Sequence, residues 1–257
     1  MRVGVYVDAF NLYYGGRSHA GSGAVAGWRW LDVRALASTL VGEQTALWPD
    51  ARVERVIYCT ARVSSRDNAH GHRDQDIYLK ALTTAGSVSH IEYGYYTSKV
   101  KTRPLAVPDR KRRPKLVNPA SPIMVKTGAL VDDPDATYMV SVADREEKGS
   151  DVNVVTHLLI DLFGKKIDAA VVISNDSDLA LPITQARLRA PSGTVHPGTN
   201  YIAGALSGDP KTGWVNTGGD SSAARTTSLT NFPTRLDATL GPRAGEDLGA
   251  WVGTASV

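Results

Sequence analysis

The feature that most constrains the fold is an alternation of short apolar runs with segments of helical periodicity. The apolar runs, rich in Val and Ile, are residues 3–7, 53–58, 88–96 and 169–174. The helical segments are residues 30–40, 74–85, 151–164 and about 178–189. Runs of this kind are typical of strands buried on both faces, and their alternation with helices indicates parallel strands. We therefore predict an α/β fold with a parallel sheet.

Two of these strands end in carboxylates. Asp8 follows the first strand, Asp176 and Asp178 follow the last, and Asp151 opens the helix before it. In open parallel sheets, ligands bind at the carboxyl ends of strands, where the strand order reverses. If the first and last strands are neighbours, these side chains converge. Clustered carboxylates repel unless a cation neutralises them, and hard oxygen ligands favour Mg²⁺ or Mn²⁺.

Each acid also has a structural interpretation. Asp8 suits a turn or a helix cap, and Asp151 complements the dipole of its helix. Asp176 and Asp178 suit a cap followed by a first-turn acid. These alternatives stay open at the level of sequence.

Nearby polar residues give weaker indications. Of Glu146 and Glu147, we expect at most one to face the site. His157 falls on the polar side of its helix and is interpreted as structural. Gly15 and Gly16 lack the remaining glycines and the lysine of a phosphate-binding loop.

The charge is unevenly distributed. The chain has a net charge of +3. Residues 97–122 form a proline-rich, basic segment without periodicity, which predicts a loop or insertion. Its cations are Lys99, Lys101, Arg103, Arg110, Lys111, Arg112, Arg113 and Lys115, against Asp109 alone. Such a strip suits a polyanion such as nucleic acid, with Tyr95 and Tyr96 near enough in sequence to stack on bases, although a solvated loop is the simpler alternative.

The remaining composition narrows the class of protein. A single cysteine, Cys59, excludes a disulfide framework and a thiolate zinc site. We find no signal-peptide core and no run long enough to span a membrane, so we expect a cytoplasmic protein without a membrane partner. Residues 191–257 hold 11 of the 24 glycines and little periodicity. We therefore divide the chain into a domain over residues 1–207 and a Gly/Thr/Ser-rich extension over 208–257.

Three segments in this order, residues 5–15, 146–152 and 172–179, resemble the bacterial NYN domain of the PIN-like nuclease superfamily, which includes the LabA-like proteins. The resemblance covers roughly residues 1–205. It implies a Rossmann-like three-layer α/β/α sandwich with a mostly parallel sheet. Members of the family usually continue into an apolar fifth strand, whereas residues 190–198 here are short and interrupted by prolines, so we expect a thin sheet edge.

The resemblance also implies a function: a Mg²⁺- or Mn²⁺-dependent endoribonuclease that hydrolyses RNA phosphodiester bonds. The catalytic and metal-binding residues are then Asp8, Asp151, Asp176 and Asp178. Asn11 and Ser174 are expected to position a ligand or a phosphate oxygen. RNA is the expected partner, contacted by Arg110, Lys111, Arg112 and Arg113, and a homodimer is left open.

Two other functions stay open. One is a PIN-like RNA-binding or regulatory protein that is catalytically weak or inactive. The other is a phosphatase-like hydrolase with an aspartyl nucleophile. The second is weakened because no second carboxylate stands two residues after Asp8.

Overall fold

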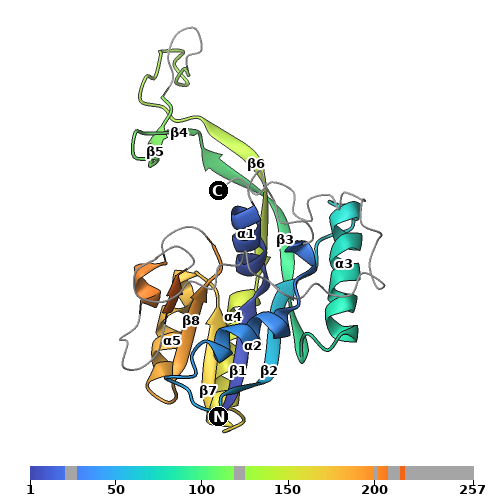
Figure 1. Cartoon of the computed structure of the whole chain (residues 1–257). Helices are drawn as coiled ribbons and strands as arrows, with labels where there is room; N and C mark the ends of the chain where they lie inside the picture. Colours follow the sequence, from blue (N-terminus) through green and yellow to red (C-terminus); the bar gives the residue numbers. More distant parts are fainter. Residues whose placement is uncertain (21–27, 119–124, 199–201, 208–214, 218–257) are drawn as a thin grey trace. The chain divides into compact units, whose positions relative to one another are not determined.

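The structure, a computed structural model, describes residues 1–20, 28–118, 125–198, 202–207 and 215–217 (Figure 1). It divides into two compact units. One comprises residues 1–96 together with 147 onward, and the other comprises Thr97–Glu146. The first unit contains the predicted α/β domain, and the second contains the predicted basic insertion.

In the described part of the chain, the central sheet has seven strands in the order β6-β3-β2-β1-β7-β8-β9. They are β1 (Arg2–Asp8), β2 (Arg52–Ala61), β3 (His90–Pro104), β6 (Met139–Lys148), β7 (Ala169–Ile173), β8 (Ser192–His196) and β9 (Val215–Thr217). Every pair from β3 to β9 is parallel. The chain moves outward from β1 through β2 to β3, and in the other direction from β7 to β9. The strand order therefore reverses between β1 and β7, which is the expected position of a ligand site.

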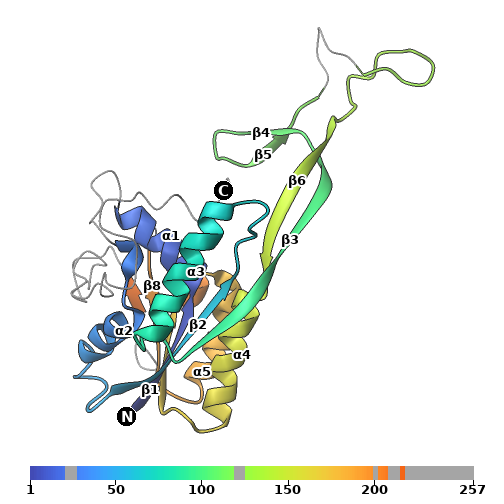
Figure 2. The ribbon, with the colours of Figure 1, turned by 90° about the vertical axis from the view of Figure 1, so that its right-hand side faces the viewer.

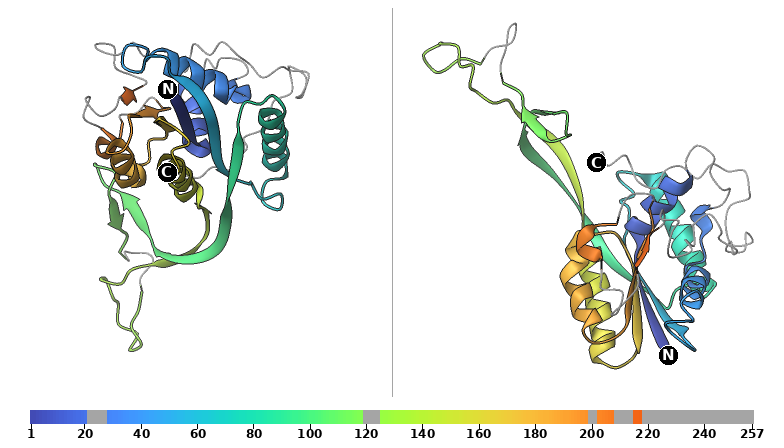
Figure 3. Two further views of the ribbon diagram at one scale, coloured as in Figure 1. Left: turned by 90° about the horizontal axis from the view of Figure 1, so that it is seen from below. Right: turned by 60° about the vertical axis from the view of Figure 1, so that its left-hand side comes forward.

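Helices cover both faces of this sheet, so the predicted three-layer α/β/α architecture is confirmed. The α-helices are α1 (Ala9–Ala20), α2 (Val33–Gly42), α3 (Ala69–Thr84), α4 (Ser150–Phe163) and α5 (Ala180–Arg187). Figure 2 shows α1, α2 and α3 on one side of the sheet, and Figure 3 shows α4 and α5 together on the other.

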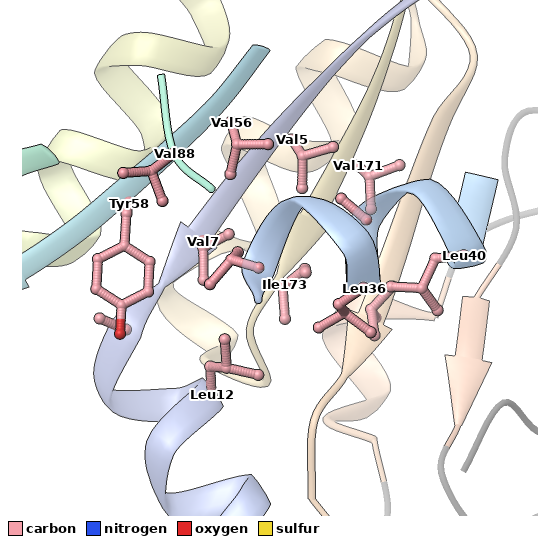
Figure 4. Close-up of a cluster of buried hydrophobic side chains, with 14 of the residues drawn as sticks. Val5, Val7, Leu12, Leu36, Leu40, Val56, Tyr58, Val88, Val171 and Ile173 are labelled. Carbon is pink, nitrogen blue, oxygen red and sulfur yellow. The ribbon is translucent and has the colours of Figure 1, made fainter. Parts of the chain in front are cut away.

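Each face of the sheet has its own hydrophobic core. Val5, Val7 and Ile173 pack with Leu36 and Leu40 of α2 under the first helical layer (Figure 4). On the opposite face, side chains of β1, β2 and β7 pack with Val154, Leu158 and Ile183 of α4 and α5; those strand residues are Tyr6, Ile57, Cys59, Ala170 and Val172. Both faces of β1 are therefore buried, as its unbroken apolar sequence predicts.

Local signals explain where the helices begin and end. Asp32 caps α2, as its position predicts, by accepting hydrogen bonds from the backbone N–H groups of Arg34 and Ala35. Gly149 precedes α4 with φ +95°, a conformation that favours glycine, and Gly164 follows it as the predicted stop. Asn68 caps α3, which begins five residues before the predicted helix.

Of the two alternatives predicted for residues 97–122, a loop or an insertion, the described residues 97–118 do not form an irregular loop. β3 continues to Pro104, and β4 (Ala106–Pro108) pairs with β5 (Pro114–Leu116) as a short antiparallel hairpin. Asp109 organises the hairpin turn by accepting hydrogen bonds from the N–H groups of Lys111 and Arg113. The side chains of β4 and β5 are exposed, so these strands lack the apolar period by which buried strands are recognised.

The expected thin sheet edge is also corrected. All five residues of β8 are buried between β7 and β9. Within the predicted extension over residues 208–257, the structure describes β9, and the other residues lie outside the described part.

Candidate carboxylate site at the strand-order reversal

The four predicted aspartates come from three places around the reversal in strand order. Asp8 is the last residue of β1, which pairs with β7. Asp176 and Asp178 lie in the connection that follows β7, and Asp151 lies in the first turn of α4. The adjacency of β1 and β7, on which the predicted convergence depends, is therefore present.

Asp8 is the buried member of the site, with 2% of its surface exposed. Its Oδ1 accepts a hydrogen bond from the Asn11 backbone N–H at 3.0 Å, and its Oδ2 accepts one from the Ser174 hydroxyl at 3.0 Å. The Asn11 side-chain amide also donates to Oδ2. Burial raises the pKa of Asp8 despite these hydrogen bonds, and the neighbouring Asp176 raises it further.

Asn11 and Ser174 join Asp8 to the connection after β7. The Asn11 side-chain oxygen accepts a hydrogen bond from Asn175 N–H at 3.2 Å, and the Ser174 hydroxyl oxygen accepts one from Asp176 N–H at 3.1 Å. Both residues therefore position Asp8 relative to Asp176. The expectation that Asn11 and Ser174 also position a ligand or a phosphate oxygen stays a prediction.

Asp176 also acts as a helix cap, because its Oδ1 accepts a hydrogen bond from Asp178 N–H at 2.9 Å. The structural interpretation from the sequence therefore describes part of its role. Asp176 is half-buried and Asp178 is exposed, so both are accessible from solvent.

Asp151 reports most clearly on the electrostatics of the site. Burial raises its pKa to about 7, and the carboxylates of Asp8, Asp176, Glu147 and Asp178 add to the rise. A carboxyl group with this pKa carries a proton about half of the time at neutral pH, so a cation bound here would displace that proton.

Glu147 is the member of its acidic pair that faces the site. Its Oε1 accepts hydrogen bonds from the backbone N–H and the hydroxyl of Ser150, at 3.1 and 2.8 Å, and so caps the start of α4. The Glu147 side chain lies close to Gly94 of β3, because a Cβ added at Gly94 would be only 2.8 Å from the same Oε1.

The donor set fits a hard divalent cation held partly through water. In the described part of the chain, the aspartates do not form a set of three whose ligand atoms all lie within 4.8 Å of one another. Mg²⁺ ordinarily keeps several water ligands and contacts only one or two carboxylates directly, so a Mg²⁺ ion at these aspartates would be held partly through water.

A different set meets that distance criterion: His90, Glu92 and His157. His90 and Glu92 are not among the candidate site residues predicted from the sequence, and His157 was predicted to be structural. His90 and Glu92 stand two residues apart on one strand, but His157 is 65 residues further along, and no local pattern connects them.

The basic strip lies in the second unit, and two of its cations are paired there. Lys101 contacts Asp144 and, at 3.3 Å, Glu146. Arg113 pairs with Asp109 at 3.0 Å. Within the described residues, Arg110, Lys111, Arg112 and Lys115 have no carboxylate within ion-pair distance and are exposed.

The two candidate stacking residues differ. Tyr95 is 63% exposed. Tyr96 makes an edge-to-face contact with Phe10, with ring centroids 5.9 Å apart. Of the two, Tyr95 therefore presents the accessible ring.

Comparisons with known proteins give one relative with a named activity. The chain is 26% identical over 202 residues to 6-hydroxy-3-succinoylpyridine 3-monooxygenase HspA of Pseudomonas putida (strain DSM 28022 / S16). The match covers 73% of this chain and 56% of the relative, so the chain spans about half the length of that protein. No protein-family model matches the chain.

A solved structure of a protein of unknown function from Vibrio parahaemolyticus RIMD 2210633 was also matched, with a TM-score of 0.37 and 11% identity. The match covers 83% of this chain and 91% of that one.

The relative overturns one prediction. A monooxygenase is an oxidoreductase, so the prediction that this chain is a phosphodiester hydrolase, a metal-dependent ribonuclease, is contradicted by the activity of the named relative.

The described helices include none that is both long and apolar enough to cross a membrane.

Proposed function

We propose that the chain binds RNA with the help of a divalent cation, Mg²⁺ or Mn²⁺, held at Asp8, Asp151, Asp176 and Asp178. This corresponds to the RNA-binding or regulatory alternative of the NYN resemblance and includes no hydrolytic step. The observation that carries it is the gathering of the four aspartates at the reversal in strand order, where burial and the surrounding carboxylates raise the pKa of Asp151 to about 7. Such a group of acids is relieved of its repulsion when a cation binds.

The residues divide into cation ligands and positioning groups. Asp8 is held by Asn11 and Ser174, which leaves one lone pair of its Oδ1 for a cation or for a water bound to it. Asp176 and Asp178 supply solvent-accessible oxygens. A cation at this position would attract a phosphate oxygen of a nucleic-acid backbone.

The exposed cations of the β4–β5 turn support RNA as the polyanion. Arg110, Lys111 and Arg112 have no carboxylate partner among the described residues, so their charge is free to contact phosphates. Tyr95 offers an exposed ring for base stacking. A cytoplasmic location is part of this proposal, and so is the choice of RNA over DNA.

Cation binding is tested by titrating Mn²⁺ into the full chain and following the loss of its free electron paramagnetic resonance signal. We expect Asp8→Asn to weaken binding by roughly tenfold or more. Asp168→Asn is the matched control, because Asp168 pairs with Arg2 rather than with the aspartate site. At pH 7, calorimetry in buffers of different ionisation enthalpy should show the release of about half a proton per ion.

RNA binding is tested with a fluorescent single-stranded RNA in Mg²⁺ and in EDTA, while a gel follows its integrity. We expect tighter binding in Mg²⁺, no such gain in Asp8→Asn, and intact RNA. Equal affinity in both buffers would contradict the proposal. Cleavage that depends on Asp8 would replace binding with hydrolysis and overturn the conclusion drawn from the relative.

A second candidate function is oxidation, which the similarity to the monooxygenase favours. Such a reaction inserts one oxygen atom of O₂ into its substrate and reduces the other to water with two electrons from a reductant. The direct test is O₂ consumption by the full chain with 6-hydroxy-3-succinoylpyridine and a reduced nicotinamide. Consumption that requires the pyridine would establish this function in place of the first.

A further inference from the structure

We propose that His90, Glu92 and His157 form a second metal site, separate from the aspartates, that binds a divalent transition-metal ion such as Zn²⁺, Co²⁺ or Fe²⁺. The proposal goes beyond RNA binding and does not depend on it. It rests on the position, distances and chemistry of these three side chains, all of which belong to the first unit.

The fold brings the three side chains to one face of the sheet. His90 and Glu92 stand two residues apart on β3, so they point to the same face. Their neighbours on β2 are Ile57 and Cys59, which belong to the core under α4. His157 is on α4, the helix that covers this core.

The distances fit shared coordination. Glu92 Oε2 lies 2.9 Å from His157 Nε2 and 3.0 Å from His90 Nε2, and the imidazole centroids are 5.4 Å apart. In a tetrahedral zinc site with bonds of about 2.0–2.1 Å, neighbouring ligand atoms are about 3.3 Å apart. Small rotations of these partly exposed side chains would open the contacts to that spacing.

The ligand types select the ion. Two imidazole nitrogens with one carboxylate suit Zn²⁺, Co²⁺ or Fe²⁺, whereas Mg²⁺ prefers oxygen ligands alone. The side chains of His90, Glu92 and His157 are 48%, 38% and 22% exposed, so an ion can enter from solvent. Three protein ligands also leave coordination positions open, as in catalytic rather than structural sites.

The alternative is a simple hydrogen-bonded trio, in which both imidazoles donate to Glu92. Glu92 Oε2 lies within hydrogen-bond distance of both imidazole Nε2 atoms, so these contacts fit this alternative as well. Direct measurement of metal binding therefore separates the two descriptions.

The probe is Co²⁺, titrated into the full chain in millimolar Mg²⁺ so that the aspartates are already occupied. Co²⁺ with four or five ligands absorbs visible light far more strongly than the hydrated ion. We expect one equivalent to produce saturable visible bands and one equivalent of Zn²⁺ to remove them. Anaerobic Fe²⁺ should compete for the same position.

Substitutions assign the ligands. Glu92→Gln, His157→Gln and His90→Gln should each weaken Co²⁺ binding by roughly tenfold or more. His90 is half-exposed, so its variant is expected to remain folded, which circular dichroism checks. His70→Gln, at an exposed position of α3, is the matched control and should bind like the parent.

The results have clear consequences. Absence of saturable bands, weak binding without one-to-one stoichiometry, or equal loss in His70→Gln would overturn the site. Asp8→Asn should leave the Co²⁺ spectrum unchanged. A variant that lost Mn²⁺ binding at the aspartates but kept Co²⁺ binding would show that the two sites bind metal ions independently.

Discussion

Replacing Asp151 by Asn should make the metal-free protein more stable at alkaline pH. The pKa of Asp151 is about 7 in the folded protein, against an ordinary value of 3.8. Between these values the folded state binds more protons than the unfolded state, so stability falls as pH rises from about 4 to about 7. The full shift corresponds to about 4 kcal/mol, and solvent screening of this half-exposed carboxyl reduces it to about 2 kcal/mol.

The gain is partly offset because an acid in the first turn of α4 favours its helix by about 0.5 kcal/mol. We therefore expect Asp151→Asn to raise the free energy of unfolding by about 1–2 kcal/mol at pH 8, where the Asp151 carboxyl is ionised. At pH 4, where this carboxyl is protonated in the folded protein, the free energy of unfolding should be unchanged. Urea unfolding in EDTA, followed by tryptophan fluorescence, measures both values. Added Mg²⁺ at a concentration c should stabilise the parent by RT ln(1 + c/Kd), a term that grows with the logarithm of the Mg²⁺ concentration above Kd, and should stabilise the variant less.

Asp168→Asn is a control of opposite sign. Hydrogen bonds from Arg2 lower the pKa of Asp168 to about 2, so its contribution to stability is present above pH 4 and is lost only as pH falls toward 2. The Asp168 variant should be less stable than the parent at pH 8. If Asp151→Asn were no more stable than the parent at pH 8 in EDTA, the burial and the repulsion that raise the pKa of Asp151 would be absent.

Two further predictions concern packing and charge. Gly94→Ala should lower the free energy of unfolding by about 1–3 kcal/mol, since a Cβ there would lie 2.3 Å from the Lys148 carbonyl oxygen. Gly42→Ala is the control, because a Cβ at Gly42 would meet no neighbouring atom within 4 Å, and it should not lower the stability. The midpoints of urea unfolding measure both effects. Replacing residues 110–112 by Gln should reduce the slope of log affinity for RNA against log salt by about 2. That is about 0.7 for each of the three cations. Arg113→Gln should reduce the slope by less than this share, because Arg113 is already paired with Asp109. An unchanged slope in the triple variant would contradict a role in phosphate contact.

The buried part of the fold could be predicted because its strands are almost wholly apolar. Val3, Val5 and Val7 are fully buried, and the alternation of such runs with helices leads to parallel pairing. The position of Asp8 at the end of β1 then follows from sequence alone. The adjacency of β1 and β7 does not, because the same elements could be ordered in other ways, and the convergence of the acids depends on it.

Three strands, β4, β5 and β8, were not predicted, and the physical reasons are of two kinds. β4 and β5 are exposed, so no apolar period marks them. β8 is buried but carries polar side chains that are satisfied within the protein. The Ser192 hydroxyl donates to the Ala190 carbonyl oxygen at 2.9 Å, and Arg187 donates to the Thr194 hydroxyl oxygen at 3.0 Å. Hydrogen bonds of this kind reduce the cost of burying polar groups, and sequence patterns do not reveal them.

A row of paired residues across the sheet separates the two proposed cation sites. Asp8, Cys59 and Glu92 are paired across β1, β2 and β3, so Asp8 and Glu92 are two strands, or about 10 Å, apart. Cys59 lies between them, and burial together with the nearby carboxylates raises the pKa of its thiol. A metal ion must displace the proton of a thiol before it binds, so a raised pKa makes Cys59 a weaker ligand than the histidines and carboxylates on either side of it. Selectivity then depends on the ligands alone, with oxygen atoms for Mg²⁺ on one side of the thiol and imidazoles for a transition metal on the other.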